Sequence, residues 1–237
     1  MKHGQVVRAQ GETFTLASTS KYAPAPRWAN RVRMTSTGAF EYLLCPRIQR
    51  VWYFDDSAGT YTDGVNVLDA DTGTSLTLNS FEAAVDFLYI GTKQPFAGLY
   101  VDVGNTNSTG SIATVKYRKS DATWASASAT DNTASGGATL AQDGTITWAV
   151  PTDWADFQVN ATDGELVWVR YEAATTLDSS VTILRLIAKP VGTIYAENQG
   201  GVGQVVEFDF STYLVGGIDL QAASGTPTLD VEWLAVR

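Results

Sequence analysis

The feature that most constrains this 237-residue chain is the density of its turn-forming dipeptides, which leave room only for short segments between them. Asp-Gly pairs stand at 63–64, 143–144 and 163–164, and Gly-Gly pairs stand at 136–137, 200–201 and 216–217. Asp and Gly tolerate the positive φ of tight primed turns, so we expect hairpins at the Asp-Gly pairs. The spacing disfavours long helices and favours many short strands.

Between these turns, apolar residues alternate with polar ones, as they do in strands with one buried face. In residues 145–150 the alternation places Ile146, Trp148 and Val150 on one face. The segments that we predict as strands are 87–90, 98–103, 112–117, 144–150, 166–171 and 181–187. One short helix is predicted at Phe81–Val85, after an Asn79 or Ser80 cap. The chain is therefore predicted to be all-β, a β-sandwich or jelly roll.

The first 50 residues differ from the rest of the chain. Pro24, Pro26 and Pro46 disfavour helix, because proline restricts both itself and the residue before it. We predict three parts. Residues 1–50 form an extended basic N-terminal arm with short strands, and 51–189 form a β-sandwich module. Short, hairpin-rich C-terminal strands in 190–237 complete or extend that sandwich.

Charge is distributed unevenly along the chain. Residues 1–50 hold eight Lys/Arg and two acidic residues, whereas the remainder holds eight basic and 23 acidic residues. Two interpretations stay open: the basic segment docks on an acidic partner, or its arginines pack on an acidic sheet of the same molecule. A nucleic-acid partner is not expected, because the acidic remainder would repel phosphate.

Candidate catalytic groups are sparse. The single histidine, His3, lies in a polar terminus with no third group to orient it, which disfavours a nucleophile–base pair. One His and one Cys cannot close a zinc site. Acidic residues between 55 and 71 could serve a glycosidase or bind calcium, but Asp is also common in turns. We expect no enzymatic activity, no metal and no cofactor.

Neither a membrane segment nor a secretion signal is predicted. No apolar run approaches the roughly 20 residues of a membrane span, and the polar N-terminus leads to no hydrophobic signal region. The single cysteine, Cys45, cannot form a disulfide within the chain and is expected to be a buried thiol. We expect a protein that is made in the cytoplasm and has no contact with a membrane.

Seven tryptophans allow two interpretations. Exposed indole rings are typical of sandwiches that bind sugars, whereas buried ones belong to the core. Trp148 alternates with apolar neighbours and is predicted to be buried. Trp124 and Trp154 lie beside Asp- and Thr-containing turns and fit either interpretation. A carbohydrate-binding module therefore stays open as an alternative.

Three runs of the central segment carry a resemblance to a known module. They are Leu88–Thr92 with Pro95–Tyr100, then Tyr117 and Trp124 leading into 144–148 and 151–154, and finally Leu166–Arg170. In this pattern of aromatics and turns, the stretch from about Phe54 to Leu186 resembles a β-sandwich module of tailed-bacteriophage virion proteins. No functional residue transfers with the resemblance, which covers a little over half of the chain.

The resemblance implies a structural protein on the virion surface, most like a capsid decoration (cement) protein. Its implied partner is the major capsid protein or another virion protein, and its implied location is the virion. We expect a homo-oligomer, with a trimer as one option. A tail fibre or baseplate attachment protein is the alternative of the same class. The residues predicted to bind the partner are the polar anchors Lys2, Arg8, Lys21, Arg27, Arg31 and Arg33 and the apolar anchors Phe14 and Trp28.

Overall fold

The computed structural model describes residues 6–17, 21–68, 71–191, 196–198, 204–210 and 215–236. Across these ranges the secondary structure is almost entirely antiparallel β-sheet, as predicted, with one short 3-10 helix, η1 (Val65–Val67). None of the described helical residues forms a segment long and apolar enough to cross a membrane. The strands divide into two compact units, Met1–Cys45 with Gly192–Arg237 (unit 1) and Pro46–Val191 (unit 2).

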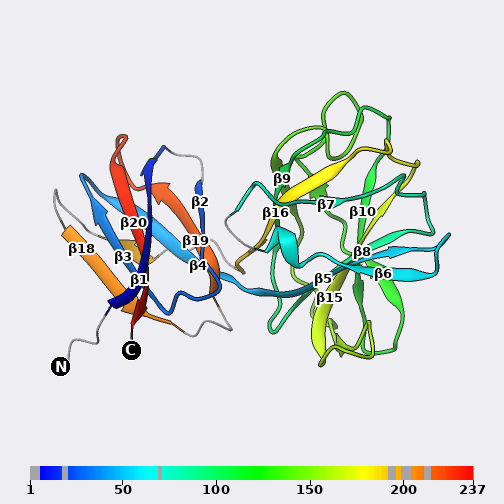
Figure 1. The fold of residues 1–237 in the computed structure, drawn as a ribbon, viewed down its shortest axis with the longest axis horizontal. Coiled ribbons are helices and arrows are strands. Elements are labelled where there is room, and N and C mark those ends of the chain that lie inside the picture. The colour runs from blue at the N-terminus through cyan, green and yellow to red at the C-terminus, as the bar shows by residue number, and fades with distance from the viewer. Residues whose placement is uncertain are drawn as a thin grey trace. The chain divides into compact units, whose positions relative to one another are not determined.

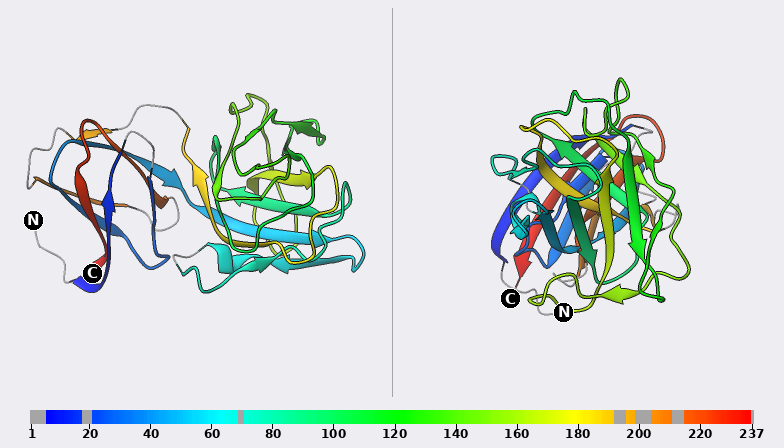
Figure 2. Two further views of the ribbon diagram at one scale, coloured as in Figure 1. Left: turned by 90° about the horizontal axis from the view of Figure 1, so that it is seen from above. Right: turned by 90° about the vertical axis from the view of Figure 1, so that its right-hand side faces the viewer.

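Unit 1 contains two four-stranded sheets (Figure 1). Sheet A has the order β1 (Val6–Thr15), β20 (Thr228–Val236), β3 (Arg31–Ser36) and β18 (Gln204–Asp209). Sheet B has the order β17 (Ala196–Asn198), β4 (Phe40–Pro46), β19 (Val215–Ala222) and β2 (Lys21–Pro24). The first and last strands lie side by side, with register from Val6↔Val236 to Thr15↔Thr228 (Figure 2).

The core of unit 1 lies between sheets A and B. Alternate residues of β3 and β20, including Met34 and Trp233, face Phe40 of β4 and Leu220 of β19 in one buried cluster. Because successive side chains of a strand point to opposite faces, the intervening residues of β3 and β20 lie on the outer face. Unit 1 is thus a two-sheet sandwich built from both ends of the chain.

Unit 2 is a second sandwich. The main path of sheet C is β11 (Trp124–Ser126), β10 (Ala113–Arg118), β15 (Leu166–Ala173), β8 (Phe87–Thr92), β5 (Ile48–Asp55) and β6 (Thr60–Asp63), and β14 (Asp156–Phe157) also pairs with β15. Sheet D has the order β12 (Thr130–Asp131), β13 (Gly144–Thr147), β9 (Gly98–Val103), β16 (Thr182–Lys189) and β7 (Leu76–Thr77).

The core of unit 2 joins these two sheets. Tyr53, Ile90 and Val169 from sheet C share a buried cluster with Val101 and Ile183 from sheet D. Trp148 is 6% exposed and donates its indole N–H to the carbonyl of Phe96 over 2.9 Å, which confirms its predicted burial. Each of the six predicted strand segments overlaps one strand of unit 2.

The observed division of the chain differs from the predicted one. Within residues 6–17 and 21–45 the chain forms strands, not a detached arm, and these strands pair with strands of the C-terminal segment. β1 pairs with β20, β2 with β19, and β3 with both β18 and β20. The C-terminal strands do complete a sandwich, but their hydrogen-bonded partners come from the N-terminal segment. Pairing between distant segments leaves no local sequence signal.

Two local predictions were wrong. Phe81–Val85 forms an irregular turn, in which Ala84 has a φ of 65° and the Phe81 side chain is fully buried in the core. The Asp-Gly pairs do not form primed hairpin turns. The β5–β6 hairpin instead turns at residues 56–59, where Gly59 has a φ of 61°. The aspartates bind neighbouring groups: Asp143, for example, accepts a hydrogen bond from the backbone N–H of Val103.

Candidate interaction surfaces

The predicted anchors Arg31 and Arg33 lie on β3 and are paired within sheet A. The guanidinium of Arg31 contacts Glu207 at 2.9 Å and also pairs with Asp209, both on the neighbouring β18. Arg33 contacts Glu207 at 2.9 Å and Glu232 of β20 at 3.3 Å. For these two arginines the structure shows the second interpretation of the basic segment, packing against acidic strands of the same molecule.

These ion pairs shift the pKa values of their members. The hydrogen bond from Arg33 is the largest cause that lowers the pKa of Glu207, and the hydrogen bond from Arg31 lowers the pKa of Asp209. The hydrogen bond to Asp209 also raises the pKa of Arg31. Unit 1 as a whole holds seven basic and eight acidic residues, so the charge of its N-terminal segment is almost cancelled by its C-terminal one.

The other predicted anchors fall into three groups. Arg8 places its guanidinium 4.4 Å from the ring centre of Trp28, and both Trp28 and Phe14 are half-buried against the unit 1 core. Lys21 and Arg27 are exposed. Lys2 lies outside the described residues. Binding of a partner by these residues stays a prediction, and Arg8, Lys21 and Arg27 are its exposed described members.

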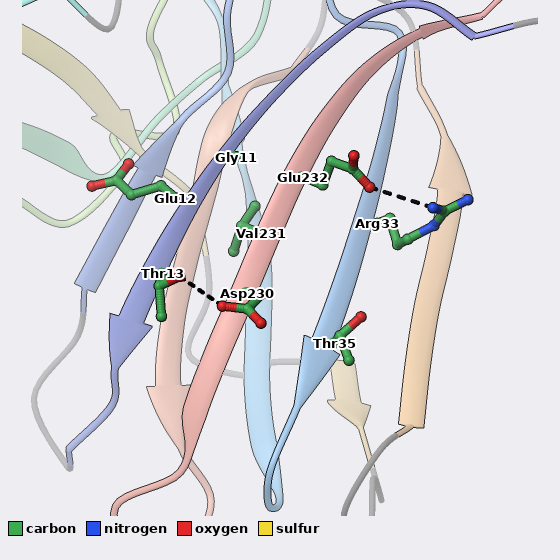
Figure 3. Close-up of a pocket in the computed structure, with 8 residues that line it drawn as sticks. All are labelled: Gly11, Glu12, Thr13, Arg33, Thr35, Asp230, Val231 and Glu232. Carbon is green, nitrogen blue, oxygen red and sulfur yellow. Dashed lines mark hydrogen bonds and ion pairs between the residues drawn. The ribbon is translucent and has the colours of Figure 1, made fainter.

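A shallow depression of about 480 Å³ lies on the outer face of sheet A (Figure 3). Its lining residues come from β1, β20 and β3: Gly11, Glu12, Thr13, Arg33, Thr35, Asp230, Val231 and Glu232. Two of its carboxylates already have partners, because the Thr13 hydroxyl donates to Asp230 over 2.7 Å and Arg33 pairs with Glu232. The depression is therefore a polar surface with much of its bonding capacity already used.

The outer face of sheet C has a different character, because aromatic side chains cover it. Tyr53, Leu88 and Val169 point into the core, so their strand neighbours point outward. We call this outer surface the aromatic face; its members are Trp52, Phe54, Tyr61, Phe87, Tyr89, Trp124, Phe157 and Trp168, together with Arg118 and Arg170.

The rings of the aromatic face form a continuous series across five strands. Tyr61 on β6 lies 4.9 Å from Phe54 on β5, between ring centres, and 6.3 Å from Tyr89 on β8. Tyr89 in turn lies 5.8 Å from Trp124 on β11. Beneath them Trp168 of β15 is fully buried and donates its indole N–H to the carbonyl of Phe157 over 2.7 Å. Such spacings are typical of favourable ring pairs.

Two arginines stack on these rings. The guanidinium of Arg170 lies 4.1 Å from the ring centre of Phe87 and 4.9 Å from that of Trp124. The guanidinium of Arg118 lies 4.4 Å from Phe157 and 5.7 Å from Trp124. All four distances fall in the range of cation–π attraction. Cations thus cover several of the ring planes on this face.

One carboxylate on the aromatic face serves two cations. Glu172, whose side chain is 10% exposed, contacts Lys116 at 2.8 Å and also pairs with Arg170. Arg118 differs from Arg170: among the described residues it has neither an ion pair nor a side-chain hydrogen bond. Arg50 also lies on this surface: it contacts Asp163 at 3.4 Å, and Asp163 accepts the indole N–H of Trp52 over 2.8 Å. Of these four cations, Arg118 is the one without a described carboxylate partner, within a unit of nine basic and seventeen acidic residues.

None of the seven tryptophans, all of which lie in the described ranges, is exposed. Trp148, Trp168 and Trp233 are buried, and the others are half-buried. Tyr61, at 39%, is the exposed aromatic side chain of the aromatic face. An open indole plane, the feature that favoured sugar binding in the sequence, is therefore not present among the tryptophans.

The acidic segment between residues 55 and 71 forms turns where it is described. Asp55 accepts hydrogen bonds from the Ser57 hydroxyl and the Ala58 N–H, and Asp71 accepts one from the Gly73 N–H. Asp69 and His3 lie outside the described residues. Among the described residues no three His, Cys, Asp or Glu side chains are placed to hold a metal ion. Cys45 is buried and is not part of a disulfide, as expected.

In unit 2 the carboxylate of Asp178 links two loops through hydrogen bonds from uncharged donors. Asp178 accepts hydrogen bonds from the Thr109 hydroxyl over 2.6 Å and from the Ser108 hydroxyl over 2.7 Å, and also from the Ser108 N–H. These bonds lower its pKa to about 2, with the Thr109 hydroxyl as the largest cause. Nearby in the sequence, Asn107 is buried and donates to the carbonyls of Thr109 and Thr139.

The aromatic face was missed by the sequence-based prediction, although a signal was present. The run Leu166–Val169 is apolar at every position, which is typical of a strand buried on both faces. Trp52 and Phe54, like Phe87 and Tyr89, are also two residues apart and so share one face. The sequence pattern did not predict that β8 pairs with both β5 and β15, which brings these side chains together.

Comparisons with known proteins assign neither a family nor an activity to this chain. No family model matches the chain, and no curated protein matches it. A solved structure of a rhamnosidase from Novosphingobium sp. PP1Y aligns with 98% of this chain at 12% identity, with a TM-score of 0.38. The chain spans about a quarter of that protein, 24% of its length. A TM-score this low supports no conclusion on fold or activity.

Proposed function

We propose that this chain is a non-enzymatic structural protein of a tailed-bacteriophage virion and acts as a capsid decoration (cement) protein. The observation that carries the proposal is the match between two boundaries. The stretch that resembles the phage module, about Phe54 to Leu186, falls inside unit 2, Pro46–Val191, which has two sheets and its own core. The resemblance thus lies within one fold unit and covers most of it.

The aromatic face supports a role in assembly. Trp, Tyr, Phe and Arg are the residue types enriched in the cores of protein interfaces. Here they gather on one sheet surface of unit 2, with Arg118 and Arg170 stacked on the rings. A decoration protein needs no chemistry, because binding only to the assembled shell stabilises that shell by mass action. The proposed partner is the major capsid protein or another virion protein, and the proposed form is a homo-oligomer.

The test uses virions that carry this chain and virions whose gene for it has been deleted. Recombinant protein added to the deleted particles should sediment with the heads and raise the temperature at which the capsid opens. Sedimentation with isolated tails and not with heads would favour a tail or baseplate attachment protein instead. If the chain is absent from purified wild-type virions and binds neither part, the proposed function is wrong.

Carbohydrate binding is the second candidate, and one observation favours it. Tyr61 is 39% exposed at the edge of the aromatic face, where a sugar ring could stack on it. The cations over Phe87, Trp124 and Phe157 count against a larger sugar platform. Titration with cell-wall oligosaccharides, followed by tryptophan fluorescence, tests this candidate. A saturable shift that Tyr61→Ala abolishes would establish it.

A further inference from the structure

Arg118 on the aromatic face is a cation that packs against two rings, and among the described residues its side chain has no hydrogen-bond or ion-pair partner. It lies on β10 directly opposite Trp124 of β11, and its guanidinium is stacked near both Trp124 and Phe157. In the same unit Arg50, Arg170 and Arg185 each face a carboxylate within 4 Å. Among the described residues Arg118 faces none.

We propose that Arg118 binds a carboxylate carried by an acidic segment of a protein partner, which docks on the aromatic face. A guanidinium is planar and offers its N–H groups in a fork that matches both oxygens of a carboxylate. Packing against the rings of Trp124 and Phe157 restricts the conformations of the Arg118 side chain beforehand. Less rotamer entropy is therefore lost when a carboxylate binds.

Charge favours an acidic partner at this place, although the unit as a whole is acidic. Lys116 and Arg170 share Glu172, and Arg50 contacts Asp163, so Arg118 is the cation of the face whose charge no described carboxylate offsets. The half-buried rings beside Arg118 limit the access of water, which strengthens a charge-assisted hydrogen bond there. An acidic side chain flanked by apolar ones would fit both the cation and the rings.

A protein segment fits the face better than an acidic sugar. Apart from the stacked pair Phe54 and Phe87, the ring pairs are edge-on or tilted, as Phe87 and Tyr89 are at 5.9 Å and 63°. Guanidinium groups lie over several of the rings. These arrangements leave little open ring surface for a pyranose. They suit side chains that pack between neighbouring rings. The inference rests on the proposed function only for the identity of the partner, not for its chemistry.

The test uses the full chain and three probes of equal length: a ten-residue oligoglutamate peptide, the corresponding oligoglutamine peptide, and an oligogalacturonate. NMR follows the indole N–H of Trp124 and the Nε–H of Arg118. We expect oligoglutamate to shift both signals saturably, more weakly at high salt, and oligoglutamine to shift neither. Arg118→Gln should weaken binding by roughly tenfold to a hundredfold, and Arg118→Lys should restore only part of it.

Lys189→Gln is the matched control. Lys189 lies on β16 of sheet D, where its ammonium donates to the Tyr100 hydroxyl over 2.8 Å, so this variant removes one cation beside an aromatic side chain of the other sheet. It should leave oligoglutamate binding unchanged. The proposal is overturned if oligoglutamate shifts neither signal, if Lys189→Gln weakens binding as much as Arg118→Gln, or if oligogalacturonate binds more tightly than oligoglutamate.

Failure here and failure of the proposed function are distinguishable. If oligoglutamate does not bind but the chain is found on virions, only the assignment of Arg118 is lost. If oligoglutamate binds through Arg118 but virions lack the chain, the proposed function is lost and the carboxylate site remains.

Discussion

Units 1 and 2 are both two-sheet sandwiches, but they use their outer sheet surfaces in opposite ways. On sheet A of unit 1, Arg31 and Arg33 are paired with carboxylates of neighbouring strands. On sheet C of unit 2, rings and guanidinium groups cover the surface, and among the described residues Arg118 has no carboxylate partner. The comparison teaches that a cluster of basic residues in a sequence does not locate a docking surface, because strand pairing can neutralise it.

The two units also differ in how the chain builds them. Unit 2 is one continuous segment, whereas unit 1 needs residues from both ends, with Val6 opposite Val236. Closing so long a loop costs more conformational entropy than pairing neighbours, and non-local pairing slows folding. We therefore expect unit 1 to be the more sensitive of the two to changes at either terminus.

Deleting residues 1–33 should have the largest effect. The deletion removes β1, β2 and the first half of β3, so unit 1 should lose its fold while unit 2 keeps its own core. Calorimetry should show one of two unfolding transitions disappear, and unit 2 signals should persist in an NMR spectrum. A deleted protein that keeps both transitions would contradict the assignment of these strands to the unit 1 core.

Replacing a buried tryptophan with alanine should destabilise the unit that contains it and leave the other unit unchanged. Trp168→Ala and Trp233→Ala each remove a side chain that is at most 2% exposed. Each should lower the free energy of unfolding of its own unit by about 3–5 kcal/mol. Denaturant unfolding followed by unit-specific NMR signals provides the measurement. Equal destabilisation of both units by either variant would show that they unfold together.

Two glycine substitutions should give contrasting, smaller effects. A Cβ at Gly91 would lie 2.8 Å from the ring of Trp168, so Gly91→Ala should destabilise unit 2 by about 1–3 kcal/mol. A Cβ at Gly11 of unit 1 would lie 3.7 Å from the nearest atom, the Val231 carbonyl oxygen, and Gly11→Ala should be tolerated. Thermal unfolding of both variants checks this contrast. Similar losses would mean that ring packing on sheet C is looser than described.

Acid should weaken both units slightly, but salt should affect them differently. The pKa values of Asp209 in unit 1 and Asp178 in unit 2 are lowered. Each carboxylate therefore stabilises the fold above its unfolded pKa, and the contribution is lost as the pH falls through its folded pKa. For Asp178 this window runs from 3.8 down to about 2.

Salt should raise the pKa of Asp209, because its partner is the charged Arg31, and should leave that of Asp178 nearly unchanged, because its partners are neutral donors. NMR titration of the two carboxyl groups at low and high salt measures both values. An equal response to salt would contradict the distinction between the units.

Much of the fold class could be predicted from the sequence, since alternation and turns are local signals. The strands of unit 2 follow from patterns such as Ile146, Trp148 and Val150, and the buried state of Trp148 followed from the same alternation. The turn chemistry was less predictable. Asp143 bonds the backbone of Val103, forty residues away in the chain, and no local rule for Asp-Gly pairs includes that contact.

By itself, the sequence determined that this chain forms short strands with one or two apolar faces, because side-chain alternation depends only on neighbours. Only the tertiary structure decided which strands pair, and hence which charges meet. Arg31 and Arg33 are neutralised by Glu207, Asp209 and Glu232, which lie more than 170 positions away. Non-local pairing likewise brings Phe157 of β14 to Arg118, whereas Trp124 is its partner in the local β10–β11 hairpin. Among the described residues no carboxylate pairs with this guanidinium.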